Sequence, residues 1–593
     1  YYTYYPGGLL KKEWHMDGKS REFWYDENEN IVQILENEKT RWKFSYDSMG
    51  RVIKAEQEEG ICENYSYDAL GNVVSVINGE GEKTSYHYNL SGLLDLVTDA
   101  CGNQTSYKYD KCRQLIEICQ PVEGKFDINV LNKLNQEQKE VRITRYQRDF
   151  VGNIINVIDP AGAETKYSYD KCGRITGKID PDGNKTNCLY NLDGTVHSCL
   201  FSNGEQIIYE YDSFKHLIKA NDWNGTTEIH PDIMGRVKKI INPEQETLDF
   251  EWGIRGENTK VIYPDGMQVI YKYDEGLRVT ECSNGKESVE YSYYPDGKLK
   301  NKIFPEKFVQ FYAYDRAGNL SELSYCDSEK QLEKISFEYD RCGRKSKIVK
   351  EGTQKEFFSY SYDPTGELIK VLKNDQPVES YSYDRFGNRV SSEIYGEHTK
   401  YQYNSVNQLI SSEKNNVISK FCYDKRGNMT EEVINNMPIR QMAFDVRNRI
   451  ISVKTEDIVA HYKNDCFGNR ISAEWNSGAG EVYKEQYFYD ATKEQDHLFC
   501  VRRNGKLTNI WRDGGILAET ENQTTNYLIN DEKTTPLYRF SFKESEACNT
   551  CDAFGNIISR KANSFWGFAG YRTEPTGQTL YANEREYDTS IGR

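Results

Sequence analysis

Hydrophobic and polar residues alternate in short runs along most of this chain. In residues 165–169, Thr-Lys-Tyr-Ser-Tyr, the two tyrosines fall on one face of an extended segment and the lysine and the serine on the other. Residues 72–77, Asn-Val-Val-Ser-Val-Ile, are rich in the β-branched side chains that favour strands. Turn-forming residues separate these runs. The pattern therefore predicts an all-β protein made of short strands.

The strand pattern repeats with a period of 21 residues. An aromatic residue followed by Asp or Asn occurs at Tyr25, Tyr46, Tyr67, Tyr88 and Tyr109. The next position of the series is Arg148, 39 residues on, which is one period plus an 18-residue insertion within 110–147, near the polar run Asn132 to Glu140. The series blurs around Asp232 and Trp252, and its later members are Tyr169, Tyr190, Tyr211, Tyr273, Tyr293, Tyr314, Tyr339, Tyr362, Tyr383, Tyr403, Tyr423, Phe444 and Asn464.

The recurring motif is Tyr-Asp-x-x-Gly, usually followed by Arg or Asn, and it predicts a hairpin turn. Asp can accept a hydrogen bond from a backbone amide as the chain bends, and Gly takes the left-handed conformation that other residues resist. A second turn often closes the period, as in Asp-Pro-Ala-Gly at 159–162. Each period is thus two short antiparallel strands. Because an isolated hairpin is marginal in water, the repeats are expected to form one long sheet with a tyrosine ladder on one face. The pattern leaves open whether this sheet closes on itself.

Composition and charge reduce the number of possible functions. A net charge of −16 disfavours binding to nucleic acid, and no run approaches the roughly 18 apolar residues of a membrane span. The chain opens without the charged and apolar regions of a signal peptide. Its 15 cysteines are scattered, which predicts reduced thiols, and the single CxxC at Cys548 and Cys551 is a weak metal signal. The eight histidines are far apart, and phosphate loops and serine elbows are missing from the sequence, so we predict no metal and no cofactor.

The Tyr-Asp-x-x-Gly-(Arg/Asn) period resembles the YD repeats of Rhs proteins, wall-associated polymorphic toxins, insecticidal toxin complex C subunits and the teneurin shell. The resemblance covers roughly residues 1–475. Several later blocks are similar to the Rhs repeat-associated core: Asp-Gly-Gly-Ile-Leu-Ala-Glu at 513–519, Asp-Ala-Phe-Gly-Asn at 552–556, Gly-Phe-Ala-Gly-Tyr at 567–571, and the stretch from Thr576 to Asp588 followed by Ser-Ile-Gly-Arg at 590–593. The sequence is therefore identified as a member of this family.

The resemblance implies a hollow β-cocoon whose core segment forms a plug and cuts the chain just beyond itself, leaving a C-terminal toxin inside. In the family this cut is made by an aspartyl-protease-like centre. Arg585 and Asp588 match the family's Arg and first Asp, although Thr589 stands where the family usually has Pro. An Asp can serve as acid or base only where its surroundings set its pKa. The alternative interpretation is an ordinary ion pair between Arg585 and Asp588.

We therefore expect a YD-repeat shell over 1–475, a core and plug over 476–593, and a toxin domain outside this chain. The expected function is encapsulation and delivery of that toxin, with the toxin, delivery proteins and an immunity protein as partners. The expected location is outside the cell or on its surface. One alternative is a cell-surface adhesion or carbohydrate-binding module that binds glycans or protein partners through its outer face. Tyrosines at period two, however, are more often a core ladder than a platform for sugars. Another is a self-processing aspartyl protease.

Overall fold

The computed structural model describes residues 1–16, 18–37, 39–121, 141–327, 330–476, 480–490, 493, 497–541, 545–548, 550–559, 565–577, 579–582 and 585–592. In this part of the chain, strands β1 to β51 belong to one antiparallel sheet of 51 strands, and β52 to β56 form two small sheets. The other elements are two short 3₁₀ turns, η1 (Pro305–Lys307) and η2 (Phe568–Gly570). The prediction of an all-β chain built from a long antiparallel repeat sheet is confirmed.

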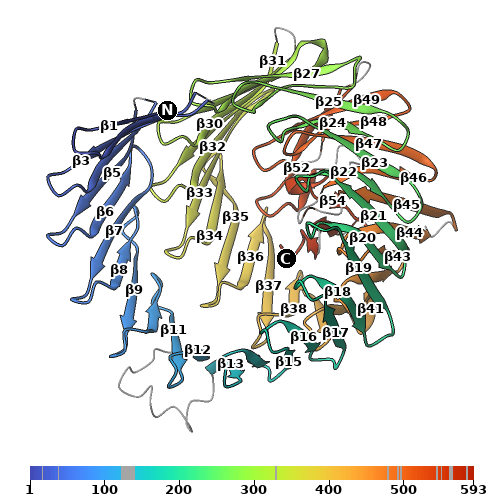
Figure 1. The fold of residues 1–593 in the computed structure, drawn as a ribbon, viewed down its shortest axis with the longest axis horizontal. Coiled ribbons are helices and arrows are strands. Elements are labelled where there is room, and N and C mark those ends of the chain that lie inside the picture. The colour runs from blue at the N-terminus through green and yellow to red at the C-terminus, as the bar shows by residue number, and fades with distance from the viewer. Residues whose placement is uncertain are drawn as a thin grey trace. The chain divides into compact units, whose positions relative to one another are not determined.

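Consecutive strands pair with one another in chain order, as β5 to β8 show (Figure 1). The strands before the insertion are β1 (Tyr2–Tyr4), β2 (Leu10–Trp14), β3 (Ser20–Tyr25), β4 (Ile31–Glu36), β5 (Lys39–Tyr46), β6 (Val52–Gln57), β7 (Cys62–Tyr67), β8 (Val73–Ile77), β9 (Lys83–Tyr88), β10 (Leu94–Thr98), β11 (Gln104–Tyr109) and β12 (Leu115–Pro121). After it come β13 (Val141–Arg148), β14 (Ile154–Ile158), β15 (Glu164–Tyr169), β16 (Ile175–Ile179), β17 (Lys185–Tyr190), β18 (Val196–Phe201), β19 (Gln206–Tyr211), β20 (Leu217–Asp222), β21 (Gly225–Pro231), β22 (Val237–Ile241), β23 (Thr247–Trp252), β24 (Asn258–Ile262), β25 (Gln268–Tyr273), β26 (Val279–Ser283), β27 (Ser288–Tyr293) and β28 (Leu299–Ile303).

The later strands follow the same alternation. They are β29 (Phe308–Tyr314), β30 (Leu320–Asp327), β31 (Lys330–Tyr339), β32 (Lys345–Glu351), β33 (Lys355–Tyr362), β34 (Leu368–Lys373), β35 (Gln376–Tyr383), β36 (Arg389–Ile394), β37 (Glu397–Tyr403), β38 (Leu409–Lys414), β39 (Val417–Tyr423), β40 (Met429–Ile434), β41 (Met437–Phe444), β42 (Ile450–Thr455), β43 (Val459–Asn464), β44 (Arg470–Asn476), β45 (Val482–Tyr489), β46 (Leu498–Arg503), β47 (Lys506–Arg512), β48 (Ile516–Glu521), β49 (Thr524–Asn530), β50 (Pro536–Phe540) and β51 (Ser545–Ala547). The small sheets contain β52 (Thr550–Cys551), β53 (Ile557–Ser559), β54 (Arg572–Thr573), β55 (Thr579–Ala582) and β56 (Arg585–Asp588).

The Tyr-Asp-x-x-Gly motif forms the turn at one edge of each hairpin, which we call the motif turn. In the turn between β5 and β6, the Asp47 carboxylate accepts hydrogen bonds from the backbone amides of Met49 (2.9 Å) and Arg51 (3.0 Å). Gly50 has a φ of 77°, the left-handed value that favours glycine. The register shifts by one residue just before Tyr46, which is the bulge that accompanies a turn of this kind. The turn chemistry expected from the sequence is confirmed.

The motif tyrosine joins its own repeat to the preceding one. The Tyr67 hydroxyl donates a hydrogen bond of 2.7 Å to the backbone carbonyl of Val52, 15 residues upstream. The same bond recurs at Tyr25, Tyr46, Tyr88, Tyr109, Tyr190, Tyr273 and Tyr383. Where the repeat lacks tyrosine, another donor replaces it, such as the Trp252 indole (2.6 Å to Val237) or the Asn530 amide (2.8 Å to Ile516). Replacement of tyrosine by another donor therefore explains irregular copies such as Trp252, whereas Phe444 occupies the same position without a donor.

The Arg or Asn after the motif glycine also has a physical role. Arg51 donates to the second oxygen of Asp47 (2.7 Å), and its guanidinium lies 4.7 Å from the ring centre of Tyr67 in the next repeat. Asn72 donates in the same way to Asp68 (2.9 Å). These hydrogen bonds, from backbone and side chain, lower the pKa of both aspartates below its ordinary value. Each motif turn is thus tied to its own carboxylate and to the next repeat.

Replacing Tyr67 by Phe is expected to weaken this link. The Val52 carbonyl loses its donor, so local opening of β6 and β7 should become easier by about 0.5–1.5 kcal/mol. Hydrogen exchange of the β7 amides measures this change, with exposed Tyr1→Phe as the control that leaves it unaltered. Unchanged protection of β7 in the Tyr67 variant would show that the hydroxyl contributes nothing.

The insertion lies between two paired strands. Pro121 at the end of β12 is opposite Val141 at the start of β13, so the hairpin resumes directly on either side of residues 122–140. The polar run Asn132 to Glu140 falls outside the described residues. The insertion is therefore an extension of one hairpin connection and leaves the register of the repeat intact.

The prediction that all cysteines are reduced thiols is wrong for one pair. Cys188 in β17 and Cys199 in β18 are directly opposite each other, with Cα atoms 4.2 Å apart, and form a disulfide. Their separation of 11 residues spans a motif turn. Sequence spacing alone did not indicate that the two side chains meet across the ladder. Thirteen other cysteines, including Cys548 and Cys551, remain as thiols.

The chain divides into two compact units. The first consists of Tyr1–Tyr167, Tyr291–Lys302 and Phe308–Lys420, and the second of Ser168–Glu290, Ile303–Lys307 and Phe421–Arg593. Each unit combines an earlier and a later stretch of the sheet. The expected boundary near residue 475 stays a prediction, and the sheet itself continues to β51.

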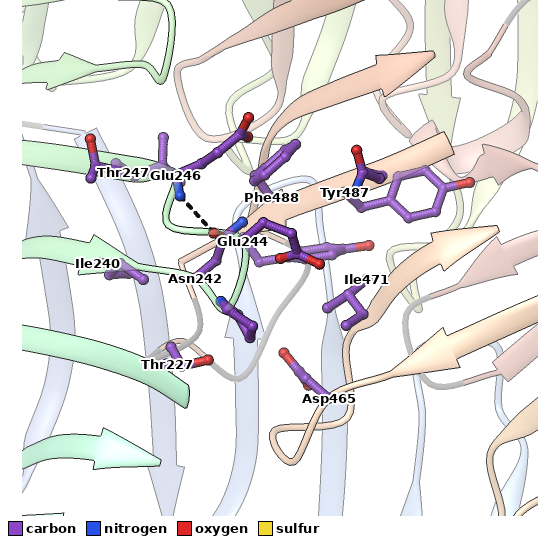
Figure 2. Close-up of a pocket in the computed structure, with 14 residues that line it drawn as sticks. Thr227, Ile240, Asn242, Glu244, Glu246, Thr247, Asp465, Ile471, Tyr487 and Phe488 are labelled. Atoms are coloured by element: carbon purple, nitrogen blue, oxygen red, sulfur yellow. Dashed lines mark hydrogen bonds between the residues drawn. The ribbon is translucent and has the colours of Figure 1, made fainter. Parts of the chain in front are cut away.

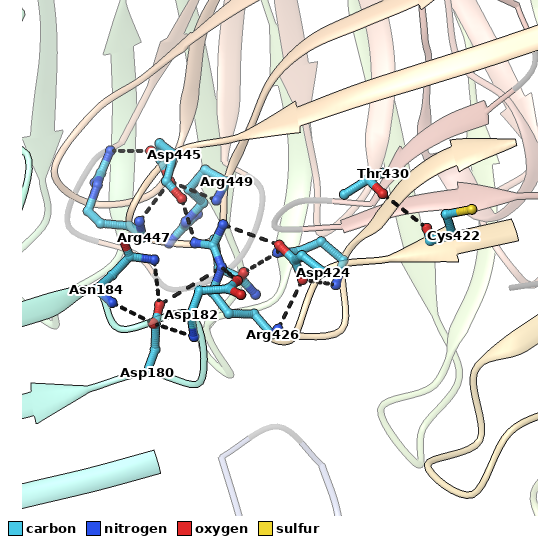
Figure 3. Close-up of polar contacts among 12 residues, drawn as sticks. Asp180, Asp182, Asn184, Cys422, Asp424, Arg426, Thr430, Asp445, Arg447 and Arg449 are labelled. Carbon is cyan, nitrogen blue, oxygen red and sulfur yellow. Dashed lines mark hydrogen bonds and ion pairs between the residues drawn. The ribbon is translucent and has the colours of Figure 1, made fainter. Parts of the chain in front are cut away.

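Within each unit, motif turns of the later strands dock on the opposite turns of the earlier strands, which we call closing turns. In the first unit, Arg341 in the motif turn 340–343 donates its backbone amide to Glu80 (3.0 Å) in the closing turn 78–81. In the second unit, Arg426 in the motif turn 424–427 donates to Asp182 (3.0 Å) in the closing turn 180–183 (Figure 3). Another contact joins Cys466 and Asp222, where the Cys466 amide donates to the carboxylate (2.7 Å). We call this row of contacts the seam.

Candidate functional site: the anchored C-terminal segment

The described residues between 565 and 592, which we call the C-terminal segment, pack on the buried face of the second unit. Trp566 is 2% exposed and belongs to the hydrophobic cluster formed by side chains of β42 to β49, including Tyr462, Tyr487 and Ile510. The Trp566 indole donates a hydrogen bond of 2.9 Å to Glu519 in β48. The small sheet of β54, β55 and β56 follows in the chain. The segment is therefore fixed to the sheet by both apolar and polar contacts.

Arg470 at the start of β44 is the central polar anchor. Its side chain is 1% exposed and donates to Glu574 (2.6 Å) and to Glu586 (3.2 Å) of the C-terminal segment. The guanidinium also lies 3.8 Å from the ring centre of Tyr462 and 4.3 Å from that of Tyr581. Charge-assisted bonds of this kind are strong where water is excluded.

Arg572 in β54 forms the second anchor. Here the arginine belongs to the C-terminal segment and its partners belong to the sheet, whereas Arg470 belongs to the sheet. It is 2% exposed and donates to the Tyr489 hydroxyl of β45 (2.9 Å). Its guanidinium lies 3.9 Å from the ring centre of Tyr487. Arginine is suited to this position because its flat guanidinium stacks on aromatic rings and stays charged.

Asp588, predicted from the sequence, forms the third anchor. Its side chain is 11% exposed. One carboxylate oxygen accepts a hydrogen bond from Arg440 in β41 (2.7 Å), and the other accepts from the amide (3.1 Å) and hydroxyl (2.6 Å) of Ser590. Glu432 in β40 contacts the same Arg440 nitrogen at 3.1 Å. Two carboxyl groups therefore share one buried arginine.

Arg585 lies apart from this carboxylate. It is exposed and pairs with Ala582 across β55 and β56. Residues three apart in a strand point to opposite faces, so Arg585 and Asp588 are separated by the sheet. Among the described residues, the arginine bonded to Asp588 is Arg440, and the local ion pair between Arg585 and Asp588 is thus not the arrangement found.

Several charged groups lie close together around these anchors. Burial raises the pKa of Glu586 above its ordinary value, and the nearby Glu574 adds to this rise while Arg470 opposes it. Burial alone lowers the pKa of Arg440, but Asp588 and Glu432 outweigh it and raise that pKa. Arg440 therefore stays charged beside these carboxyl groups. Chemically, the arrangement can hold a chain segment in place and position the Asp588 carboxylate.

Sequence reasoning found Asp588 and missed its surroundings. Arg440 and Asp588 are 148 residues apart, and Arg470 and Glu574 are 104 residues apart. The sequence held one indication of the role of Arg470. Asn469 already occupies the position after the motif glycine, Gly468, and its amide binds the motif aspartate, Asp465. An arginine in the next position has no turn to stabilise, and its side chain is available for a distant partner.

A small pocket lies beside the anchors in the second unit. It is lined by β22, β23 and their closing turn on one side and by Asp465, Ile471, Tyr487 and Phe488 on the other (Figure 2). Burial raises the pKa of Asp465 to about 6, although bonds from Asn469 oppose this, and the nearby Asp222 adds to the rise. Asp465 occupies the motif position at which less buried aspartates such as Asp170 have a lowered pKa. The same residue type thus titrates differently when its turn is buried in the seam.

The described residues hold no group of three or more His, Cys, Asp or Glu side chains that could bind a metal ion. No helix in the same residues is long and apolar enough to cross a membrane.

Comparison with known proteins finds one matching sequence family and several structures with a similar fold. The sequence matches the Teneurin YD-shell family over residues 59–227 and 302–593. The crystal structure of TcdB2-TccC3 is similar with a TM-score of 0.67 and 13% identity, covering 100% of this chain and 37% of the other. The crystal structure of TcdB2-TccC3-TEV gives a TM-score of 0.65 at 13% identity, covering 99% and 36% of the two chains. The Tc holotoxin pore of Photorhabdus luminescens gives 0.65 at 12% identity, covering 100% and 36%.

The chain therefore spans little more than a third of the length of the structures it matches. No curated protein sequence matches it. The family match extends through the C-terminal segment and includes both Arg470 and Asp588. Together with the repeat, the motif turns and the long antiparallel sheet, this match shows that the chain belongs to the Teneurin YD-shell family and is a YD-repeat scaffold.

Proposed function

We propose that this chain is the scaffold of a toxin-delivery shell that encloses a C-terminal toxin domain, with residues 476–593 as the core and plug. The observation that carries the proposal is the fixed C-terminal segment. Ion pairs from Arg440 and Arg470 hold it on the buried face of the sheet. A domain that followed this segment would begin at a fixed position on the sheet. After an unanchored tail, the same domain would move freely.

We further propose that Asp588 takes part in self-cleavage just beyond this chain, which would free the toxin inside the shell. The carboxylate is buried and positioned by Arg440 and Ser590, as a catalytic carboxylate requires. The proposed products act outside the producing cell, and the proposed partners are the enclosed toxin, delivery proteins and an immunity protein.

The natural gene product, expressed with its own C-terminus, tests the cleavage. Wild type should be cut and Asp588→Asn should be cut at least tenfold more slowly, because the amide cannot exchange a proton in the same way. Glu432→Gln is the matched control, since it changes the other carboxyl on Arg440 and leaves Asp588 in place. Equal cutting of wild type and Asp588→Asn would rule out this role, and a thermal unfolding curve for each variant separates loss of chemistry from loss of folding.

The ladder tyrosines do not favour the carbohydrate-binding alternative. Tyr381, Tyr401, Tyr462 and Tyr487 are at most 5% exposed, so these rings belong to the ladder and present no face to a sugar.

A further inference from the structure

The disulfide in β17 and β18 stands where several other repeats have an aromatic side chain in the ladder. In those repeats, the residue two positions before the motif tyrosine is aromatic and lies opposite a small or β-branched residue of the next strand. Such pairs are Tyr65 and Val76, Tyr86 and Val97, Tyr107 and Ile118, Tyr146 and Val157, Tyr209 and Ala220, and Phe250 and Val261. In the hairpin of β17 and β18, the same two positions are Cys188 and Cys199.

This exchange of residues replaces packing by a covalent bond. A cross-strand pair such as Tyr and Val buries apolar surface and helps to hold two strands together. Two thiols are smaller and bury less surface, so the hairpin with reduced Cys188 and Cys199 lacks both the bond and the packing of its neighbours. The bond joins residues 11 apart and limits how far the hairpin can open. The stability of this hairpin therefore depends on the oxidation state of two sulfur atoms.

The same hairpin lies between two contacts of the seam. Before β17, the closing turn 180–183 carries Asp182, which accepts a hydrogen bond from Arg426 (3.0 Å) (Figure 3). At the end of β18, Phe201 lies two residues after Cys199 and is 8% exposed. The Phe201 ring centre is 5.9 Å from the guanidinium of Arg447, a residue of the motif turn 445–448. Opening of the hairpin would thus disturb the seam on both sides.

The disulfide can be reached by a reductant in solution. Cys188 and Cys199 are partly exposed, whereas the thiols of Cys119, Cys282 and Cys500 are buried. Thiol–disulfide exchange requires an external thiolate to reach one of the two sulfur atoms, so partly exposed bonds react more readily than buried ones. The position of the pair thus allows it to be reduced and formed again in the folded chain.

We propose that Cys188 and Cys199 are a redox-controlled latch on the seam of the second unit. Two molecules of a glutathione-type thiol open it, because their exchange with the bond leaves two cysteine thiols and one disulfide of the reductant. The reverse exchange, with that disulfide as the oxidant, closes the latch and releases two thiols. In a reducing compartment the hairpin opens easily, and in oxidising surroundings the hairpin and its seam contacts are fixed. The inference does not depend on whether a toxin is enclosed.

Hydrogen exchange of the purified chain tests the proposal, first after oxidation with glutathione disulfide and then after reduction with dithiothreitol without denaturant. Alkylation and mass spectrometry follow the two thiols. Reduction should speed exchange of the β17 and β18 amides at least tenfold, and that of the turns 180–183 and 424–427 at least threefold. Strands β7 and β8 are the internal control, since the pair of Tyr65 and Val76 contains no sulfur. The other thirteen cysteines are thiols already, so dithiothreitol acts on this bond.

Two double variants separate the bond from the packing. Cys188→Ser with Cys199→Ser should exchange like reduced wild type and should not respond to dithiothreitol. Cys188→Tyr with Cys199→Val restores the pair of the neighbouring repeats, and it should keep the slow exchange of oxidised wild type under both conditions. The proposal would be overturned if glutathione disulfide did not form the bond or if the folded chain resisted reduction. It would also be overturned if reduction left the exchange of the hairpin or of the two turns unchanged.

Discussion

Replacing Arg470 by Met is expected to lower the free energy of unfolding of the second unit by about 3–5 kcal/mol and to release the C-terminal segment. The side chain is 1% exposed and neutralises two glutamates of that segment, Glu574 and Glu586. Methionine leaves both carboxylates in a buried site without their cation. Loss of one partner of a buried ion pair is costly because the remaining charge stays desolvated.

The measurement is denaturant unfolding followed by tryptophan fluorescence in a background where the other seven tryptophans are replaced by Phe, so that the signal comes from Trp566, which is 2% exposed in the C-terminal segment. Arg145→Met is the matched control. Arg145 also pairs with a glutamate, Glu117 at 3.2 Å, but its side chain is 52% exposed, so its loss should change stability by less than about 1 kcal/mol. If Arg470→Met and Arg145→Met unfold alike, the buried ion pairs do not hold the segment.

Replacing Asp465 by Asn is expected to stabilise the second unit at pH 8 by on the order of 2–3 kcal/mol. The folded pKa of Asp465 is about 6, above the ordinary value of 3.8. The folded state therefore binds the proton more tightly than the unfolded state. The cost of ionising this carboxyl is present above pH 6 and is relieved as the pH falls from about 6 toward 4. Asparagine stays neutral and removes that cost.

Thermal unfolding between pH 4 and pH 8 measures the effect. The variant should show a flatter dependence on pH than wild type, though some remains because Asp531 also has a pKa of about 6. Asp170→Asn, at the same position of an exposed motif turn, should instead lower the stability of the second unit at pH 8. Its pKa is lowered, so its contribution is present above the ordinary pKa and is lost as the pH falls. Destabilisation of Asp465→Asn at pH 8 would contradict the account.

The sequence predicts the local structure of this protein well. The period of Tyr46, Tyr67 and Tyr88 predicts hairpins, and the Asp and Gly of each motif predict the turn, because both depend on residues within one repeat. The inserted residues between β12 and β13 were located from the broken period alone.

Contacts between distant repeats were not predictable in this way. The seam joins turns such as 180–183 and 424–427, which are 244 residues apart where Asp182 meets Arg426. A period-two pattern sets which face is buried, but it does not set which turn of a later repeat reaches which turn of an earlier one. For the same reason Asp588 was identified by resemblance, whereas Arg440 and Arg470 were found only in the fold.

Protection of the chain that follows residue 593 in the natural gene product tests the central claim most directly. The purified protein would be treated with a nonspecific protease, and the cutting rate of that region would be compared with the rate for the same region expressed alone. An enclosing scaffold predicts cutting at least a hundredfold slower than for the isolated region, and loss of this protection in Arg470→Met. Equal cutting rates in the intact protein and the isolated region would contradict enclosure.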